Sequence, residues 1–136
     1  MITASDMISF VKDVTHWDEV SSNTDIFSDL PCTGDDFHEL IAKYAKKYSV
    51  DMSSYLWYFH ANEEGQNLGG FFFRPPYKRV KRIPITPQIL TNFANEGKWD
   101  IKYPEHKLAK YRIDIWISWL VLLVIIIFFA LISCMK

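Results

Sequence analysis

Histidine and cysteine can bind metals and act in nucleophilic catalysis, but their spacing in this chain indicates neither a metal site nor a catalytic pair. The four histidines share no spacing typical of metal ligands: His16, His38, His60 and His106. Cys32 precedes His38 by six residues, but a Cys/His nucleophilic pair also needs an orienting group and an oxyanion site, and the sequence shows neither. We therefore expect no metal, no cofactor and no enzyme activity.

The acidic pairs and the glycine pair are explained without catalysis. Glu63 and Glu64 stand in a polar stretch and are expected to be solvated, and Gly69-Gly70 alone indicates a turn, not a phosphate-binding loop. Asp35 and Asp36 begin an amphipathic segment, where carboxylates cap unpaired N–H groups and favour the positive end of the helix dipole. An alternative, that Asp36 presents an anion to a protein partner, stays open.

Helical periodicity predicts the elements that position these residues. Apolar residues recur at helical spacing over residues 36–48, with lysines on the opposite face near the end. Residues 6–15 predict an earlier helix capped by Ser5 or Asp6, and residues 55–60 a short aromatic one. Thr86-Pro87 and Gly97 are typical start and stop signals, and they predict a last helix between them.

Residues 62–84 lack any helical period. Residues 68–73 and 80–83 flank Pro75-Pro76 and predict a short β-hairpin. We expect the aromatic residues at 57–59 and 71–73 to form the core of the short helix and this hairpin. The alternative is that they line an apolar ligand pocket.

Several motifs, in this order, resemble those of acyl carrier proteins. They are Asp25-Ile26-Phe27-Ser28-Asp29-Leu30, Gly34-Asp35-Asp36-Phe37 in the place of Gly-x-Asp-Ser-Leu, Tyr48-Ser49-Val50-Asp51, and Ile85-Thr86-Pro87. The chain is most similar to a bacterial family of acyl-carrier-like proteins of unknown function. That similarity rests on the Gly-Asp-Asp motif, an inserted Arg-Pro-Pro and Lys-Arg-Ile-Pro segment, and Gly97-Lys98-Trp99.

This resemblance implies a small helical bundle over roughly residues 5–100 that binds other proteins. In a working carrier, the serine at the start of the second helix carries phosphopantetheine. The matching position here is Asp36, and a carboxylate cannot form that phosphodiester. The resemblance therefore implies a carrier-like module without a prosthetic arm, and we expect a partner protein to contact Asp35, Asp36 and Glu39.

Charge is distributed unevenly along the chain. Residues 1–65 hold twelve acidic and four basic residues, whereas residues 66–136 hold four acidic and eleven basic ones. Part of this excess is a basic run that we expect on an anionic membrane surface or, alternatively, on a solvated loop: Arg74, Lys78, Arg79, Lys81 and Arg82. A net basic domain and a nucleic-acid-binding motif are both lacking, so we expect no nucleic-acid partner.

The C-terminal segment is the most apolar part of the chain. Residues 115–134 hold no charged residue. At about 1.5 Å rise per residue, a helix of this length spans about 30 Å, the thickness of a bilayer's hydrocarbon core. Trp116 and Trp119 suit the headgroup region. We therefore predict a transmembrane helix from Ile115 to Cys134, the alternative being a buried core helix or a pair of strands.

These features predict a mainly α protein in three parts. They are a cytoplasmic acyl-carrier-like domain with a hairpin insert (1–100), a juxtamembrane tether (101–114) and a single-pass tail anchor (115–134). Basic residues before the anchor favour a cytoplasmic N-terminus, and the bacterial resemblance implies the inner membrane. The expected function is a non-catalytic protein-binding module of membrane-associated acyl or lipid metabolism. The alternative is an adaptor or regulatory subunit of an envelope complex.

Overall fold

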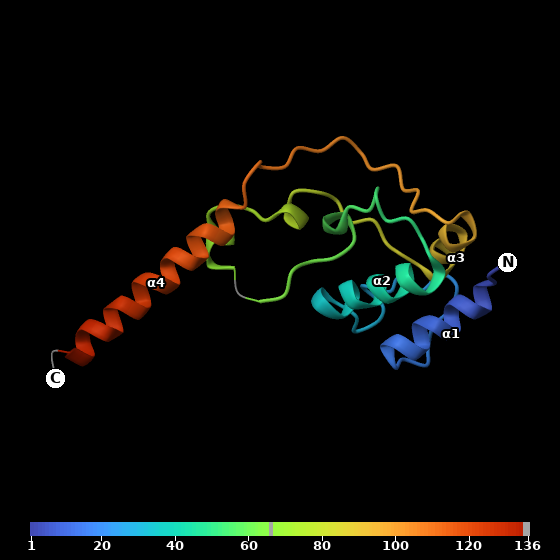
Figure 1. The fold of residues 1–136 in the computed structure, drawn as a ribbon, viewed down its shortest axis with the longest axis horizontal. Helices are drawn as coiled ribbons and strands as arrows, with labels where there is room; N and C mark the ends of the chain where they lie inside the picture. The colour runs from blue at the N-terminus through green and yellow to red at the C-terminus, as the bar shows by residue number, and fades with distance from the viewer. Residues whose placement is uncertain (66, 135–136) are drawn as a thin grey trace. The chain divides into compact units, whose positions relative to one another are not determined.

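The structure is a computed structural model that describes residues 1–65 and 67–134 (Figure 1). Its elements, in chain order, are α1 (Ala4–Thr15), α2 (Gly34–Tyr48), η1 (Trp57–Phe59), η2 (Leu68–Phe71), η3 (Pro76–Lys78), α3 (Pro87–Glu96) and α4 (Ile113–Cys134). Across these described ranges no β-strand forms, and one isolated parallel bridge joins Asp51 and Lys98. The prediction of a mainly α fold is confirmed.

The chain forms two compact units. The first unit consists of residues 1–64 and 81–105 and holds α1, α2, η1 and α3; the second consists of residues 65–80 and 106–136 and holds η2, η3 and α4. The segment 65–80 therefore belongs to the unit that holds α4, whereas the sequence analysis assigned it to the helical domain of residues 1–100.

A capping box starts α1. Thr3 Oγ1 accepts a hydrogen bond from the N–H of Asp6 over 3.2 Å, and the Asp6 carboxylate accepts from the N–H of Thr3 over 2.8 Å. This reciprocal pair satisfies two backbone donors that the helix itself leaves unpaired. The N-cap is thus Thr3, and neither Ser5 nor Asp6, because Asp6 at the third helical position completes the box.

The apolar faces of α1, α2 and α3 form the core of the first unit. Its fully buried side chains include Met7, Val11, Phe37, Leu40, Tyr44, Leu90 and Trp99. Burial of each such side chain stabilises the fold by about 1.5–3 kcal/mol. The hydroxyl of Tyr44 also donates to the carbonyl of Leu90 over 2.7 Å, which ties α2 to α3. This core fixes α2 while leaving the carboxylates of its first turn exposed.

The boundaries of α3 follow the signals in the sequence. Thr86 Oγ1 accepts from the N–H of Ile89 over 3.3 Å, Pro87 occupies the first turn, and Gly97 ends the helix with a φ of 74°. A left-handed backbone of this kind favours glycine, because it has no Cβ. The predicted last helix of the domain is confirmed.

The predicted β-hairpin is wrong. Asn67 Oδ1 accepts from the N–H of Gly70 over 2.9 Å and caps the 3-10 turn η2, while residues 80–83 join no strand. An asparagine cap followed by two glycines favours a tight turn over an extended chain. The β-forming residues at 71–73, on which the prediction depended, stay exposed rather than entering a core.

One long apolar helix, α4, ends the described chain (Figure 1). It runs for 22 residues, and none of its most apolar 18-residue window is buried. Its length and composition are sufficient to cross a membrane. The exposed surface of α4 does not agree with the alternative of a buried core helix.

Candidate functional site

A surface cavity of about 180 Å³ lies between the end of α1 and the start of α2. Its lining includes Thr15, His16, Cys32, Asp36, Glu39 and Lys43. Small-molecule sites usually exceed about 300 Å³, so this cavity has the size to accept a side chain of a partner rather than a cofactor. It brings together two of the three predicted partner-binding residues, Asp36 and Glu39. The third, Asp35, is exposed in the same first turn of α2.

The first turn of α2 carries Asp35 and Asp36 without using either as its N-cap. The cap residue is Thr33, whose carbonyl accepts from the N–H of Asp36 over 3.1 Å and whose side chain makes no capping hydrogen bond. Both carboxylates are exposed at the positive end of the helix dipole, an arrangement that stabilises by about 0.3–1 kcal/mol each. Of the two roles predicted for them, neither carboxylate is the N-cap, and their position at the positive end of the dipole agrees with the other.

Gly34, the first residue of the Gly-Asp-Asp motif, is required by geometry. Its φ is 49°, and a Cβ built on it would lie 1.8 Å from Cγ of Glu64. Its N–H donates to Oδ1 of Asn62 over 3.2 Å. The exposed Glu64 side chain could move aside, but the left-handed backbone would strain any residue with a Cβ, so glycine suits the start of the helix on which the two aspartates stand.

Ionisation at this cavity does not favour nucleophilic chemistry. Burial raises the pKa of the Cys32 thiol to about 11, with the Asp36 carboxylate adding to the effect. The thiol therefore stays protonated, whereas a nucleophilic cysteine needs the thiolate. Glu39 pairs with Lys43 over 2.7 Å, and this hydrogen bond and charge lower the pKa of Glu39. Glu39 thus stays ionised near neutral pH and forms an ion pair at the cavity with Lys43, which also lines it.

A buried histidine network forms the second polar cluster of the first unit. Nδ1 of His60 lies 2.9 Å from the carbonyl oxygen of Ile83, which can only accept, so Nδ1 carries the proton. Nε2 then accepts from the hydroxyl of Tyr103 over 2.8 Å. The Tyr103 oxygen in turn accepts from the indole N–H of Trp99 over 2.9 Å and from the N–H of Leu56 over 3.2 Å.

This network is structural. His60 is fully buried, and that burial lowers its pKa to about 4. A neutral imidazole with both nitrogens engaged has no access to a substrate. Sequence reasoning missed the network, because its members lie up to 47 residues apart and only the fold brings them together.

The basic run divides between the two units. Arg74, Lys78 and Arg79 belong to the second unit, and Lys81 and Arg82 to the first. Arg82 makes a two-pronged pair with Asp25, over 3.0 Å and 2.5 Å, and lies over the ring of Phe27. Burial acts to raise the pKa of Asp25, but hydrogen bonds from Arg82 and Ser28 outweigh it, and the pKa falls below its usual value. Arg82 thus has a structural partner that the sequence did not indicate.

Comparison with known families identifies the chain. Residues 5–102 match the family described as "Protein of unknown function (DUF1493)". The chain belongs to the DUF1493 family. Neither a curated protein nor a solved structure matches it. The DUF1493 match includes the cavity, η2 and most of the His60 network, and it ends one residue before Tyr103 and well before α4 begins.

Outside the DUF1493 match, α4 carries the four residues that marked the predicted anchor. Ile115, Trp116 and Trp119 are 38%, 74% and 65% exposed, and Cys134 is exposed at the other end. Beside the start of this helix, Phe71 and Phe72 are 87% and 78% exposed. The expectation that residues 71–73 pack in a core is therefore wrong.

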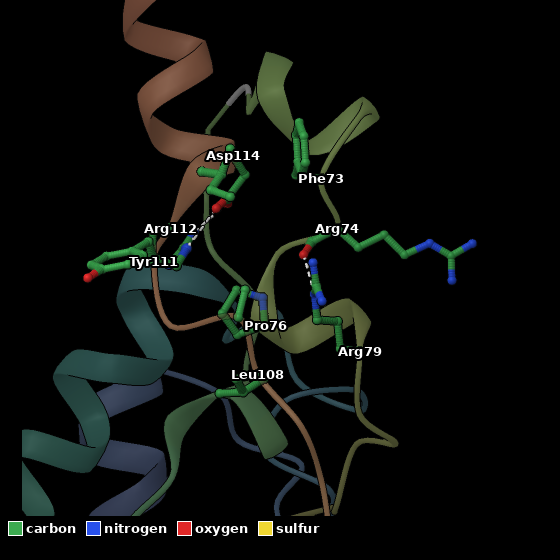
Figure 2. Close-up of a pocket in the computed structure, with 10 residues that line it drawn as sticks. Phe73, Arg74, Pro76, Arg79, Leu108, Tyr111, Arg112 and Asp114 are labelled. Carbon is green, nitrogen blue, oxygen red and sulfur yellow. Dashed lines mark hydrogen bonds and ion pairs between the residues drawn. The ribbon is translucent and has the colours of Figure 1, made fainter.

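The second unit also has a small cavity between residues 73–79 and 108–114 (Figure 2). Its volume is about 20 Å³, room for about one water molecule. Within it Arg112 pairs with Asp114 over 2.7 Å, and Nε of Arg79 donates to the carbonyl of Arg74 over 2.6 Å, while the Arg74 side chain points away (Figure 2). The space is too small for a ligand, so the cavity beside α2 is the candidate site of this DUF1493 protein.

Proposed function

We propose that this protein is a membrane-anchored, non-catalytic docking module. The observation that carries the proposal is α4, an uninterrupted helix of 22 residues whose apolar surface has no cover in the described chain. In water such a surface is unfavourable, whereas a bilayer accepts it and the helix satisfies its own backbone hydrogen bonds. The anchor holds the helical unit at a membrane surface.

The docking surface of the module is the acidic start of α2. The first unit holds fifteen acidic and eight basic residues, a net charge of −7. Asp35, Asp36 and Glu39 are exposed together on one helix, and two of them line a cavity. A partner with a basic patch would be attracted over a distance and oriented on contact.

The acyl-carrier resemblance extends this proposal to a class of partner. Asp36 stands at the position that resembles the serine of a carrier, so enzymes of acyl or lipid metabolism that recognise carriers are the proposed partners. The basic residues before α4 favour a cytoplasmic N-terminus, and we propose the bacterial inner membrane as the location. The alternative partner is an envelope complex, in which the protein acts as an adaptor or regulatory subunit.

Carbodiimide crosslinking of the full chain in its native membrane tests the docking surface, because this reagent joins carboxylates to lysines in contact. We expect adducts from Asp35, Asp36 or Glu39 to a lysine of one membrane-associated protein. Their amide variants should lose the adduct. The matched control replaces Asp13, Asp18 and Glu19, which are also exposed, by amides and so changes the net charge by the same amount. This control should keep the adduct, because the carboxylates of the docking surface are intact.

The identity of the crosslinked protein decides between the two partner classes. An acyl-transfer or lipid enzyme supports the carrier-like role, and an envelope subunit supports the adaptor. Adducts that form equally well without the three carboxylates would contradict the proposed docking surface.

A further inference from the structure

We propose that Phe71 and Phe72, the phenylalanine wedge, insert into the interfacial region of an anionic bilayer beside the first turn of α4. The inference rests on the proposed function in one respect, that α4 spans the membrane. It adds a second membrane contact, made by a segment more than forty residues away in the sequence.

The wedge exposes a large apolar surface, and the contact of such a surface with water is unfavourable. Phe71 is 87% exposed and Phe72 is 78% exposed, although Gly69, two residues before Phe71, is buried. These two adjacent, largely exposed aromatic side chains belong to or directly follow a turn that contacts the apolar helix α4, and exposed apolar patches mark interaction surfaces.

Hydrogen bonds fasten the turn that carries the wedge to the start of α4. The N–H of Gly69 donates to Oγ of Ser118 over 2.9 Å, and the side-chain amide of Asn67 donates to Oδ2 of Asp114 over 2.7 Å. Ser118 Oγ also lies 3.0 Å from Oδ1 of Asn67. The polar groups of η2 and of the first turns of α4 therefore satisfy one another.

Gly69 allows the close approach. A Cβ built on it would lie 2.0 Å from the carbonyl oxygen of Asp114. Backbone cannot yield as the end of a flexible side chain can, so any larger residue would push η2 off the helix. The wedge is thus held at a defined level along α4.

That level is the membrane interface. Asp114 and Ser118 are about 6 Å apart along the helix axis, and Trp116, 74% exposed, lies between them. The apolar run of α4 continues beyond Ser118. Aromatic residues concentrate where the hydrocarbon core meets the headgroups, and the wedge adds phenylalanines to the tryptophans already there.

The positive charge of the second unit favours an anionic bilayer as the surface that the wedge contacts. Its described residues hold one acidic residue, Asp114, which pairs with Arg112. The basic residues are Arg74, Lys78, Arg79, Lys107, Lys110 and Arg112. Arg74, Lys78 and Arg79 follow the wedge directly and are exposed, so anionic headgroups would meet positive charge next to the apolar insertion.

An environment-sensitive NBD label on the full chain tests the wedge. The label is placed through Phe72→Cys, Trp119→Cys or Asp18→Cys, each with Cys32→Ala and Cys134→Ala, in vesicles of phosphatidylglycerol and phosphatidylethanolamine. We expect nitroxide-bearing lipid to quench the labels at 72 and 119. Aqueous iodide should quench these two labels much less than it quenches the label at 18. The label at 18 should show the reverse.

The three positions separate failure of the wedge from failure of the anchor. If the label at 119 is in lipid and that at 72 is quenched by iodide, the wedge is overturned and the span stands. If the label at 119 is also quenched by iodide, the span fails, and the wedge with it.

Variants of the fastening network provide a second measurement. Ser118→Ala removes the acceptor of the Gly69 N–H, and Gly69→Ala removes the close approach; both should move the label at 72 toward water and leave that at 119 in lipid. Ser133→Ala is the matched control, because its hydroxyl donates to Phe129 within the same helix. A label at 72 that stays in lipid in both variants would overturn the proposed role of η2 in holding the wedge.

Discussion

Tyr103 donates its hydroxyl proton to Nε2 of His60 over 2.8 Å, and this bond fixes the imidazole as a neutral ring inside the first unit. The same oxygen accepts from Trp99 and from the backbone of Leu56. One hydroxyl thereby joins the segment after α3 to the segment around η1, and the stability of the unit depends on it in two measurable ways.

The first prediction concerns pH. Burial lowers the pKa of His60 from 6.5 to about 4, so the unfolded chain binds the proton more tightly than the folded one. The stabilising effect is complete above about pH 6.5 and is lost as the pH falls toward 4, by up to about 3 kcal/mol. Urea unfolding of the full chain in detergent, followed by tryptophan fluorescence, should show this loss between pH 7 and 4.5.

Two histidine variants test the assignment. His60→Gln should flatten the pH dependence in that window, at the cost of lower stability at pH 7. His16→Asn is the control, because His16 is exposed and asparagine tolerates its left-handed backbone. An unchanged pH profile in His60→Gln would show that another group titrates.

The second prediction compares two buried tyrosines. Tyr103→Phe leaves three groups without their partner and should lower the free energy of unfolding by about 1–3 kcal/mol. The hydroxyl of Tyr55 is buried and makes no hydrogen bond to the described residues. Tyr55→Phe should therefore be neutral or stabilise by about 1 kcal/mol. Equal losses for both variants, measured by urea unfolding, would contradict the hydrogen-bond network.

The third prediction separates two arginines of the basic run. Arg82→Gln breaks the pair with Asp25 and should lower stability by about 1 kcal/mol, since the pair is partly exposed. Arg74→Gln should leave stability unchanged, because this side chain is exposed and points away (Figure 2), but should weaken binding of the chain to phosphatidylglycerol-containing vesicles at low salt. A double-mutant cycle of Arg82→Gln with Asp25→Asn measures the pair directly. No coupling in that cycle would show that the pair does not stabilise the fold.

Periodicity and capping signals predicted the helices well. The apolar stripe of α2 and the Thr86-Pro87 and Gly97 signals of α3 are local, and the structure places both helices within two residues of the expected ranges. The helix start explained the positions of Asp35 and Asp36, whereas their choice as partner-binding residues, with Glu39, came from the acyl-carrier resemblance.

Long-range contacts explain what the sequence did not reveal. Residues 71–73 have high β-propensity and were expected in a hairpin, but Gly69 packs against Asp114, 45 residues further on, and the Asn67 cap favours a turn. His60, Tyr103 and Trp99 likewise show no motif in the sequence. Pairing of Arg82 with Asp25 depends on the loop before α2, which has no periodic pattern.

The fourth prediction concerns the carrier position. Incubating the full chain with a phosphopantetheinyl transferase and coenzyme A should leave its intact mass unchanged, because Asp36 offers a carboxylate where a carrier offers a hydroxyl. Asp36→Ser tests whether the surroundings are carrier-like, and a mass gain of one phosphopantetheine in that variant would support the acyl-carrier resemblance. A mass gain in the unaltered chain would show that the motif is wrongly aligned.

Extraction of the full chain from native membranes tests the central claim, that α4 anchors the protein, most directly. Helices that span a bilayer resist alkaline carbonate and high salt, whereas proteins bound through surface charge are released. We predict that the full chain stays in the membrane pellet under both treatments and that a chain ending at Lys110 is recovered in the supernatant. Release of the full chain by salt or carbonate would contradict the anchor.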